Sequence, residues 1–189
     1  MIAGIRLALL TIKRAMQNLI SRAEAIEAIR KEFELNRERT ESVRLILAEC
    51  DEHGVTLPAQ RAYILATAWH ESRLMPITEW GSDAYLRSKP YWPHIGRGFV
   101  QLTWDYNYRK QGDRLGIDLL SNPDLALEKD IAADILVYGM KHGQFTGKKL
   151  SDYIHSGKTD FPNARRIING TDRAEMVAGY ASRFLKHLK

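Results

Sequence analysis

The sequence predicts a mainly α-helical protein, and three observations support this. Residues 21–50 combine Glu, Arg, Ala, Ile and Leu at helical spacing and contain neither Gly nor Pro. Strand-like patterning is confined to short pieces near residues 99–102. The chain has 189 residues, enough for one domain with a buried core and an appended segment.

The first 20 residues form a basic and apolar segment. Arg6, Lys13 and Arg14 interrupt it, leaving residues 7–12 as the longest uncharged apolar core, and no small-residue cleavage site follows. We therefore expect neither a signal peptide nor a membrane span. The spacing of the apolar residues predicts an amphipathic helix; these residues are Ile5, Leu9, Ile12, Met16 and Leu19. Its apolar face contacts an anionic membrane or lipopolysaccharide, or else packs against the domain or another copy of the chain.

Two further helices are expected between residues 21 and 50, because a polar segment, N-R-E-R-T-E, separates two apolar faces. Thr40 is the candidate N-cap of the second helix. The sequence D-E-H-G at residues 51–54 predicts its end, since glycine is common just past a helix C-terminus. We divide the chain into an N-terminal amphipathic helical extension, residues 1–40, and a domain, residues 41–189.

A helix that begins at Pro58 carries the first candidate catalytic residue, Glu71. Proline is tolerated in the first helical turn, and good helix formers follow it. Ala68, Thr67 and Ile64 precede Glu71 at helical spacing, so its carboxyl lies on the apolar side near the end of the helix. Desolvation and the negative end of the helix dipole favour the protonated carboxyl. This suits a general acid, which protonates the leaving oxygen when a sugar–sugar bond is hydrolysed.

Glu79 is the second candidate. Pro76 is expected to end the preceding helix, and Thr78, Gly81 and Ser82 favour turns. A carboxylate on a polar loop stays ionised and can activate water, so the two acids have the unlike environments of an acid and a base. The alternative is that Glu71 merely ends a helix and Glu79 is a solvated loop residue.

The rest of the chain adds aromatic residues and two more helices. Four aromatic residues either line a saccharide cleft or form the core of a small lobe; they are Trp80, Tyr85, Tyr91 and Trp92. A cap at Asn122 followed by Pro123 predicts a helix through Met140. The sequence D-R-A-E predicts a capping box that starts the last helix at Asp172.

Composition limits the partners. The formal net charge is +5 and the pI about 9.3, which favours an anionic partner such as a wall polymer. We expect no nucleic-acid partner, because no zinc finger, recognition helix or aromatic RNA-binding pattern occurs. Six histidines show no ligand spacing, so we expect no metal and no cofactor. The single cysteine, Cys50, cannot form an internal disulfide and is expected to be a small buried apolar residue.

Three segments occur in the order found in one family. They read H-E-S at residues 70–72, G-R-G-F-V-Q-L-T-W-D-Y-N-Y at 96–108, and R-R-I-I-N-G-T-D-R-A-E at 165–175. Together they resemble glycoside hydrolase family 19, which contains chitinases and phage lysozymes. The run at residues 81–104 resembles the endolysins of phages that infect Gram-negative bacteria. The resemblance covers the chain from about Pro58 to its C-terminus.

This resemblance implies a fold and roles for residues. The fold would be a two-lobed helical domain of the lysozyme superfamily with a substrate cleft. Glu71 would be the general acid, Glu79 the general base, and Thr103 would hold the attacking water. Catalysis would proceed with inversion, which needs carboxyls about 6.5–9.5 Å apart. The eight-residue spacing is shorter than in many relatives, so Asp83 is a second candidate for the base. The implied substrate-binding residues are Gln101, Asn107, Tyr106, Asn169 and Arg173.

The expected function is that of an endolysin, which hydrolyses the β-1,4 bonds between N-acetylmuramic acid and N-acetylglucosamine in peptidoglycan. A chitinase of the same family is the enzymatic alternative, and a non-catalytic wall-binding module is the alternative from another class. We expect a monomer made in the host cytoplasm, without a signal peptide, and released to the cell wall during lysis.

Overall fold

In a computed structural model, the backbone of residues 2–189 is described, and so are their side chains except those of residues 2–9, 11, 14 and 15. The fold is mainly helical, as predicted. The elements in chain order are α1 (Ile2–Glu32), α2 (Arg37–Glu52), α3 (Pro58–Ser72), β1 (Ile77–Thr78), α4 (Asp83–Arg87), β2 (Arg97–Gly98), α5 (Asp105–Leu115), η1 (Pro123–Leu127), α6 (Lys129–His142), α7 (Leu150–Tyr153), β3 (Ile154–His155), β4 (Lys158–Thr159), α8 (Phe161–Ala164), η2 (Arg165–Ile167) and α9 (Ala174–Leu185).

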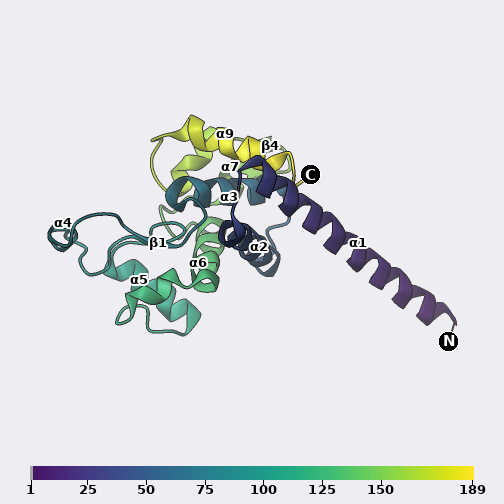
Figure 1. Ribbon diagram of the computed structural model, residues 1–189, viewed down its shortest axis with the longest axis horizontal. Coiled ribbons are helices and arrows are strands. Elements are labelled where there is room, and N and C mark those ends of the chain that lie inside the picture. Colours follow the sequence, from purple (N-terminus) through teal and green to yellow (C-terminus); the bar gives the residue numbers. More distant parts are fainter. Residues whose placement is uncertain (1) are drawn as a thin grey trace.

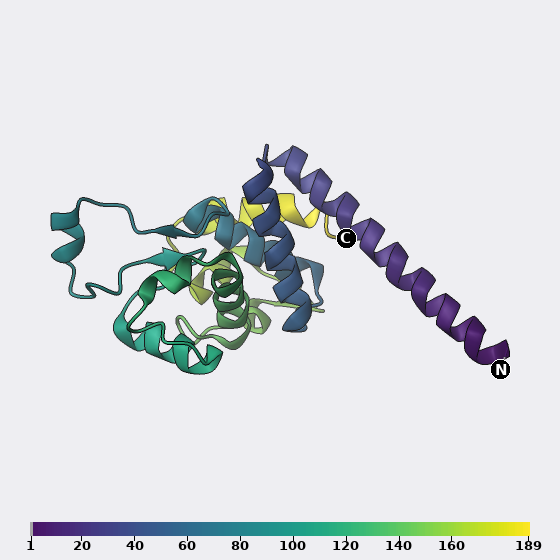
Figure 2. The same ribbon diagram turned by 60° about the horizontal axis from the view of Figure 1, so that its bottom comes forward.

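The N-terminal segment is one long helix, α1, which projects from the rest of the molecule in both ribbon views (Figures 1 and 2). Its C-terminal part belongs to the core, because Ile26 and Ile29 are buried there. Ile12, Met16 and Leu19 are exposed, so this part of the helix does not pack against the domain. The expected contributions of Ile5 and Leu9 to the same face lie outside the described side chains. Of the helices described, none combines the length and apolar character needed to span a membrane.

Helix α2 begins earlier than predicted. Asn36 is its N-cap, and the side-chain oxygen of Asn36 accepts a hydrogen bond from the backbone N–H of Arg39 (3.0 Å). The prediction of Thr40 as the cap is wrong: Thr40 lies inside the helix, where its hydroxyl donates to the carbonyl oxygen of Asn36 (2.8 Å). The end of α2 is as predicted, since the helix stops at Glu52 and Gly54 follows with a φ of 62°.

The core is built around α3. This helix starts at Pro58 as predicted and packs most extensively against α9, while α6 packs against α2. The fully buried side chains of the core include Tyr63, Leu65 and Phe184. Cys50 is fully buried, as predicted, and burial raises the pKa of its thiol to about 12. The boundary proposed at residue 40 stays a prediction, although the buried Ile29 shows that the first 40 residues contribute to this core.

A second group of elements lies to one side of α6, with α4 on an extended loop and α5 below it (Figure 1). It is organised by the antiparallel pair β1–β2, in which Ile77 is opposite Gly98 and Thr78 opposite Arg97. Arg97 also bridges to Leu102, so the strand signal expected near residues 99–102 is observed slightly earlier in the chain. The guanidinium of Arg97 is buried and donates to the hydroxyl of Tyr108 (3.2 Å) and to Asp124 (2.8 Å).

Two predicted helices differ from those observed: one is interrupted, and the other starts later than predicted. Residues 122–140 are not one helix: η1 ends at Leu127, and Glu128 is extended before α6 begins. This break lets Asp124 pair with Arg97 and lets the carbonyl of Ala126 lie against Gly98. The capping box at Asp172 does not form, because α9 begins at Ala174 without a side-chain cap.

Candidate active site

Glu71 lies in the last turn of α3, with 18% of its side chain exposed. Its carboxylate accepts a hydrogen bond from the guanidinium of Arg165, with 2.5 Å between Oε1 and Nη1. Arg165 belongs to η2, has only 4% of its side chain exposed, and also donates to the carbonyl oxygen of Asp172 (3.0 Å). Glu71 is therefore partly buried, as expected, and is paired with a buried cation from the C-terminal part of the chain.

The backbone turns sharply just after Glu71. Arg73 and Leu74 both have positive φ values, 54° and 59°, and their N–H groups donate back to Trp69 and Ala68 at the end of α3. Residues other than glycine rarely adopt this left-handed backbone conformation, because it strains the backbone. Such backbone strain is often found at functional sites. The burial of Leu74 holds this turn in place, and the turn directs the chain into β1.

Glu79 follows β1 directly and is held by neutral donors. The hydroxyl of Tyr91 donates to Oε1 (3.0 Å), and the backbone N–H of Gly96 donates to Oε2 (3.1 Å). The backbone N–H of Glu79 in turn donates to the carbonyl oxygen of Gly96 (2.6 Å). Burial raises the pKa of Tyr91, and the Glu79 carboxylate raises it further, so the phenol remains a donor at neutral pH. Glu79 is thus a positioned loop carboxylate.

Asp83, the other candidate for the base, lies in a different setting. It is the first residue of the short helix α4 and is exposed. A carboxylate is favourable at that position because the N-terminus of a helix carries a partial positive charge. The cap itself is Ser82, whose hydroxyl oxygen accepts from the N–H of Tyr85 (3.3 Å). The hydrogen bond from Tyr91 goes to Glu79, so the geometry favours Glu79 over Asp83 as the candidate base.

Gln101 is positioned next to Glu79. Its side-chain nitrogen donates to the carbonyl oxygens of Ile77 (3.0 Å) and Gly98 (3.3 Å), which ties its loop to both strands. A methyl group added at Gly96 would stand 2.7 Å from the side-chain oxygen of Gln101, so that oxygen lies against the residue that binds Glu79. The φ of Gln101 is 56°, a second left-handed position close to the site.

Thr103 and Asn107 are connected through the backbone. Both side chains are partly buried, and the side-chain nitrogen of Asn107 donates to the carbonyl oxygen of Thr103 (2.9 Å). Asn107 therefore fixes the backbone of Thr103 at the start of α5. The role of Thr103 in holding a water stays a prediction.

Aromatic rings continue outward from Glu79. The rings of Tyr91 and Trp104 are 5.2 Å apart, and Trp104 stacks on Tyr106 at 6.1 Å. Trp104 and Tyr106 are exposed, and Trp80, next to Glu79, has 95% of its surface exposed. The alternative in which these loop aromatics form the core of a small lobe is therefore wrong for Trp80. Exposed rings beside a carboxylate are suited to stacking on sugars.

The two C-terminal residues implied by the resemblance are both exposed. The side-chain oxygen of Asn169 accepts from the N–H of Gly170 (2.8 Å), and Arg173 precedes α9 with a φ of 54°. The C-terminal residue that reaches Glu71 is Arg165, which the sequence interpretation missed. Arg165 is the first residue of the segment R-R-I-I-N-G-T-D-R-A-E. Its place in this family-like segment is the signal from which it could have been found in the sequence.

His70 adds to this electrostatic environment. Burial lowers the pKa of its imidazole, the Glu71 carboxylate opposes that effect, and the charges of Arg165 and Arg173 lower the pKa further. A neutral imidazole next to the candidate acid is the consequence at neutral pH.

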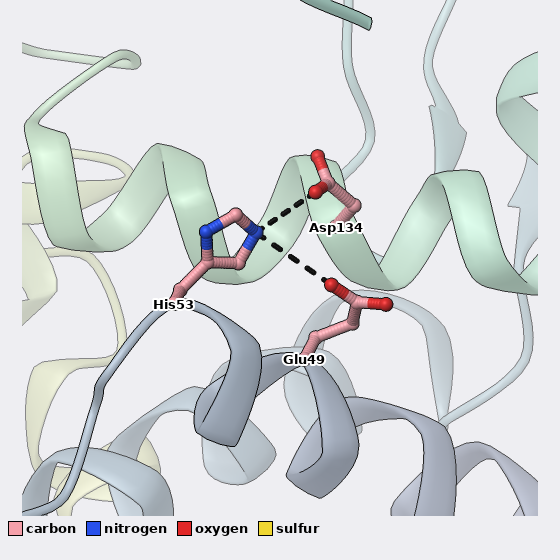
Figure 3. Close-up of side chains that lie close together, drawn as sticks. All are labelled: Glu49, His53 and Asp134. Atoms are coloured by element: carbon pink, nitrogen blue, oxygen red, sulfur yellow. Dashed lines mark hydrogen bonds and ion pairs between the residues drawn. The ribbon is translucent and has the colours of Figure 1, made fainter.

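Away from this site, Glu49, His53 and Asp134 lie together (Figure 3). The Nε2 atom of His53 is 2.8 Å from Oδ2 of Asp134 and 3.6 Å from Oε2 of Glu49. Glu49 lies in the last turn of α2, and His53, four residues later, is the C-cap residue of the same helix.

The contacts of this cluster are nevertheless those of an ion-pair network. The second oxygen of Asp134 is bound by the guanidinium of Arg114, so both oxygens of that carboxylate already have partners. Lys141 donates to the backbone carbonyl of His53. Burial raises the pKa of Glu49, and the charge of Asp134 raises it further. With cations present on both sides, the cluster joins α2 to α6 without needing a metal ion.

The scaffold is a lysozyme-like helical domain that carries the candidate residues Glu71 and Glu79. The family model described as "Chitinase class I" (Glyco_hydro_19) matches residues 67–142, which include Glu71, Glu79, Gln101, Thr103 and Asn107. A bacterial family 19 chitinase of known structure is 25% identical, covers 86% of this chain and 93% of its own, and superposes with a TM-score of 0.63. These findings support the resemblance to glycoside hydrolase family 19, with the family model matching residues 67–142.

Other similar proteins share the fold or part of the sequence. Chitinase C from Streptomyces griseus HUT6037 is 21% identical and shares the fold, with a TM-score of 0.64 over 87% of this chain and 93% of its own. Inactive chitinase-like protein 1 of Hevea brasiliensis is 35% identical over 80 residues, which are 39% of this chain and 26% of that protein. Chitinase 11 of Oryza sativa subsp. japonica is 51% identical over 41 residues, 22% of this chain and 16% of its own. The chain thus spans about a quarter or less of these curated relatives.

Proposed function

We propose that this protein hydrolyses β-1,4 glycosidic bonds, with Glu71 as the general acid and Glu79 as the general base. The observation that carries the proposal is that the two carboxylates have hydrogen-bond partners of different charge. Glu71 is paired with the buried guanidinium of Arg165, and Glu79 is held by the neutral donors Tyr91 and Gly96. Two acids with different surroundings are the requirement for acid and base roles at one glycosidic bond.

In this mechanism Glu71 gives its proton to the glycosidic oxygen as the bond to the anomeric carbon breaks. Arg165 then stabilises the carboxylate that remains. A water near Thr103 attacks the anomeric carbon from the opposite face and loses its proton to Glu79. The configuration at the anomeric carbon is inverted, a course that requires the two carboxyls to be far enough apart to admit one water.

The proposed substrate is bacterial peptidoglycan, cut between N-acetylmuramic acid and N-acetylglucosamine, and the proposed role is that of a phage endolysin that lyses the host from within. The run at residues 81–104 supports this role through its resemblance to endolysins, and the net charge of +5 suits an anionic wall polymer. In this proposal a monomer made in the host cytoplasm reaches the cell wall at lysis.

Chitin is the second candidate substrate, because the solved structures and several similar proteins are named chitinases. A third candidate is a wall-binding module without activity, since one similar protein is named an inactive chitinase-like protein. The presence of both carboxylates favours an enzyme, because a binding module has no use for a proton donor.

The test is digestion of purified Gram-negative peptidoglycan and, separately, of chitin, followed by mass spectrometry of the soluble products. Wild type is compared with Glu71→Gln and with Glu38→Gln, which removes an exposed carboxylate at the start of α2. We expect fragments ending in reducing N-acetylmuramic acid from wild type and Glu38→Gln, and a loss of about 10²–10⁴-fold for Glu71→Gln.

Each other result changes a specific part of the proposal. Full activity of Glu71→Gln removes its role as the acid. Fragments ending in reducing N-acetylglucosamine change the bond that is cut, and fragments from chitin alone select the second substrate. Absence of fragments from either polymer selects the wall-binding module. Proton NMR of the first product formed reports the anomeric configuration and so tests inversion.

A further inference from the structure

Helix α1 has its C-terminal part in the core, and its N-terminal part extends beyond the domain. Its C-terminal part is fixed by the buried side chains of Ile26 and Ile29 and by the ion pair between Glu32 and Arg183 (2.8 Å). Arg22 also pairs with Asp51 of α2. N-terminal to these contacts the helix continues without a break and leaves the domain (Figures 1 and 2).

The projecting part has one apolar face. Ile12, Met16, Leu19 and Ile20 are between 50% and 67% exposed. At 3.6 residues per turn these four residues fall within about 100° of one another, the width of an apolar stripe. The opposite side is polar and exposed; it carries Gln17, Asn18 and Ser21. A stripe of large apolar side chains in water is unfavourable unless a partner covers it.

The charge of this segment is of one sign. Residues 1–23 contain four basic residues and no acidic residue, so they account for most of the net charge of +5. These basic residues are Arg6, Lys13, Arg14 and Arg22. Lys13 is exposed and, by helical spacing, lies at the edge of the apolar stripe. An apolar stripe with Lys13 at its edge, on a segment that has no acidic residue, complements a surface that is apolar inside and anionic outside.

We propose that the exposed apolar face of α1 docks on an anionic phospholipid bilayer, with the helix lying in the plane of the membrane surface. Met16 and Leu19 enter the boundary between headgroups and acyl chains, and Lys13 contacts lipid phosphates. A second copy of the chain is a poorer occupant, because pairing two such segments brings together residues of the same charge. Nucleic acid would match the cations and leave the apolar stripe uncovered.

The test measures binding of the full chain to vesicles by co-sedimentation. One set of vesicles contains phosphatidylglycerol and phosphatidylcholine, and the other contains phosphatidylcholine alone. The variant Met16→Glu/Leu19→Glu places two acids on the apolar face. The matched control, Gln17→Glu/Ser21→Glu, adds the same charge on the polar face. Both pairs of positions are exposed, so the domain is expected to stay folded, which circular dichroism checks.

We expect wild type to bind the anionic vesicles, and less strongly at high salt. The apolar-face variant is expected to bind at least tenfold more weakly, and the control less than threefold more weakly. Equal losses in the two variants would overturn the proposal, since charge alone would then explain binding. Failure of wild type to bind, or binding to lipopolysaccharide but not to phosphatidylglycerol, overturns it as well. So does a dimer in sedimentation velocity that the apolar-face variant dissociates while vesicles bind neither protein.

Discussion

Glu71 and Glu79 are only eight residues apart, yet the fold supports them by different means. Glu71 sits on the end of a long helix and is paired with Arg165, 94 residues away in the sequence. Glu79 sits after a two-residue strand and is held by Tyr91 and Gly96, which belong to the same local loop system. The first carboxylate depends on long-range packing and a cation, and the second on local backbone geometry and neutral donors.

This difference explains how one short segment supplies two chemically distinct acids. A cation stabilises a carboxylate that has lost its proton, which suits a group that begins the reaction as an acid. Neutral donors orient a carboxylate without neutralising it, which leaves its charge available to activate water. The turn at Arg73 and Leu74, with two consecutive left-handed residues, separates the two supports.

The largest expected effect concerns the loop carboxylate. Glu79→Gln removes the proposed base and is expected to lower kcat by about 10²–10⁴-fold. Asp83→Asn, the matched change at the exposed start of α4, is expected to keep kcat within about twofold of wild type, because substitutions at exposed surface sites have small effects. Initial rates on a soluble oligosaccharide measure both. Loss of activity in Asp83→Asn with retention in Glu79→Gln would transfer the role of base to Asp83.

The next largest expected effect on kcat comes from removing the Arg165 guanidinium. Arg165→Met removes the ion pair to Glu71 and is expected to lower kcat by about 10- to 100-fold, the equivalent of a charged hydrogen bond worth about 1.5–3 kcal/mol. Arg166→Met changes the exposed neighbour and serves as the control. Arg165→Lys keeps the charge and is expected to restore part of kcat. If Arg165→Met only lowers the melting temperature while kcat is unchanged, Arg165 is structural.

Much of the fold follows from local sequence signals, and the failures share one cause. Pro58 and the glycine at 54 correctly marked the start of α3 and the end of α2. Thr40 and Asp172 were assigned as caps from local patterns, but Asn36 supplies the cap of α2 and α9 starts at Ala174. The break at Glu128 accompanies the pairing of Asp124 with Arg97, a contact between distant segments. Local propensity does not contain such contacts.

The same limit applies to the site. Glu71 and Glu79 could be proposed as site residues because each has its own local context, a helix end and a turn-rich loop, and because the neighbouring segments resemble glycoside hydrolase family 19. Arg165 was missed because its importance depends on where the C-terminal segment folds back onto α3. The ion-pair network of Glu49, His53 and Asp134 was missed for a similar reason, since α2 and α6 are brought together only by packing.

The smallest expected effect on kcat comes from removing the hydrogen bond that the Tyr91 hydroxyl donates to Glu79. Tyr91→Phe removes the hydroxyl that donates to Oε1 but keeps the ring that packs against Trp104. We expect kcat to fall by about 3- to 10-fold with KM unchanged, since one hydrogen bond worth about 1 kcal/mol is lost and the aromatic surface remains. Tyr85→Phe is the control, because that exposed hydroxyl accepts from Lys89. A rise in KM at constant kcat would instead make the Tyr91 hydroxyl a substrate contact, and the support of Glu79 would then rest on Gly96.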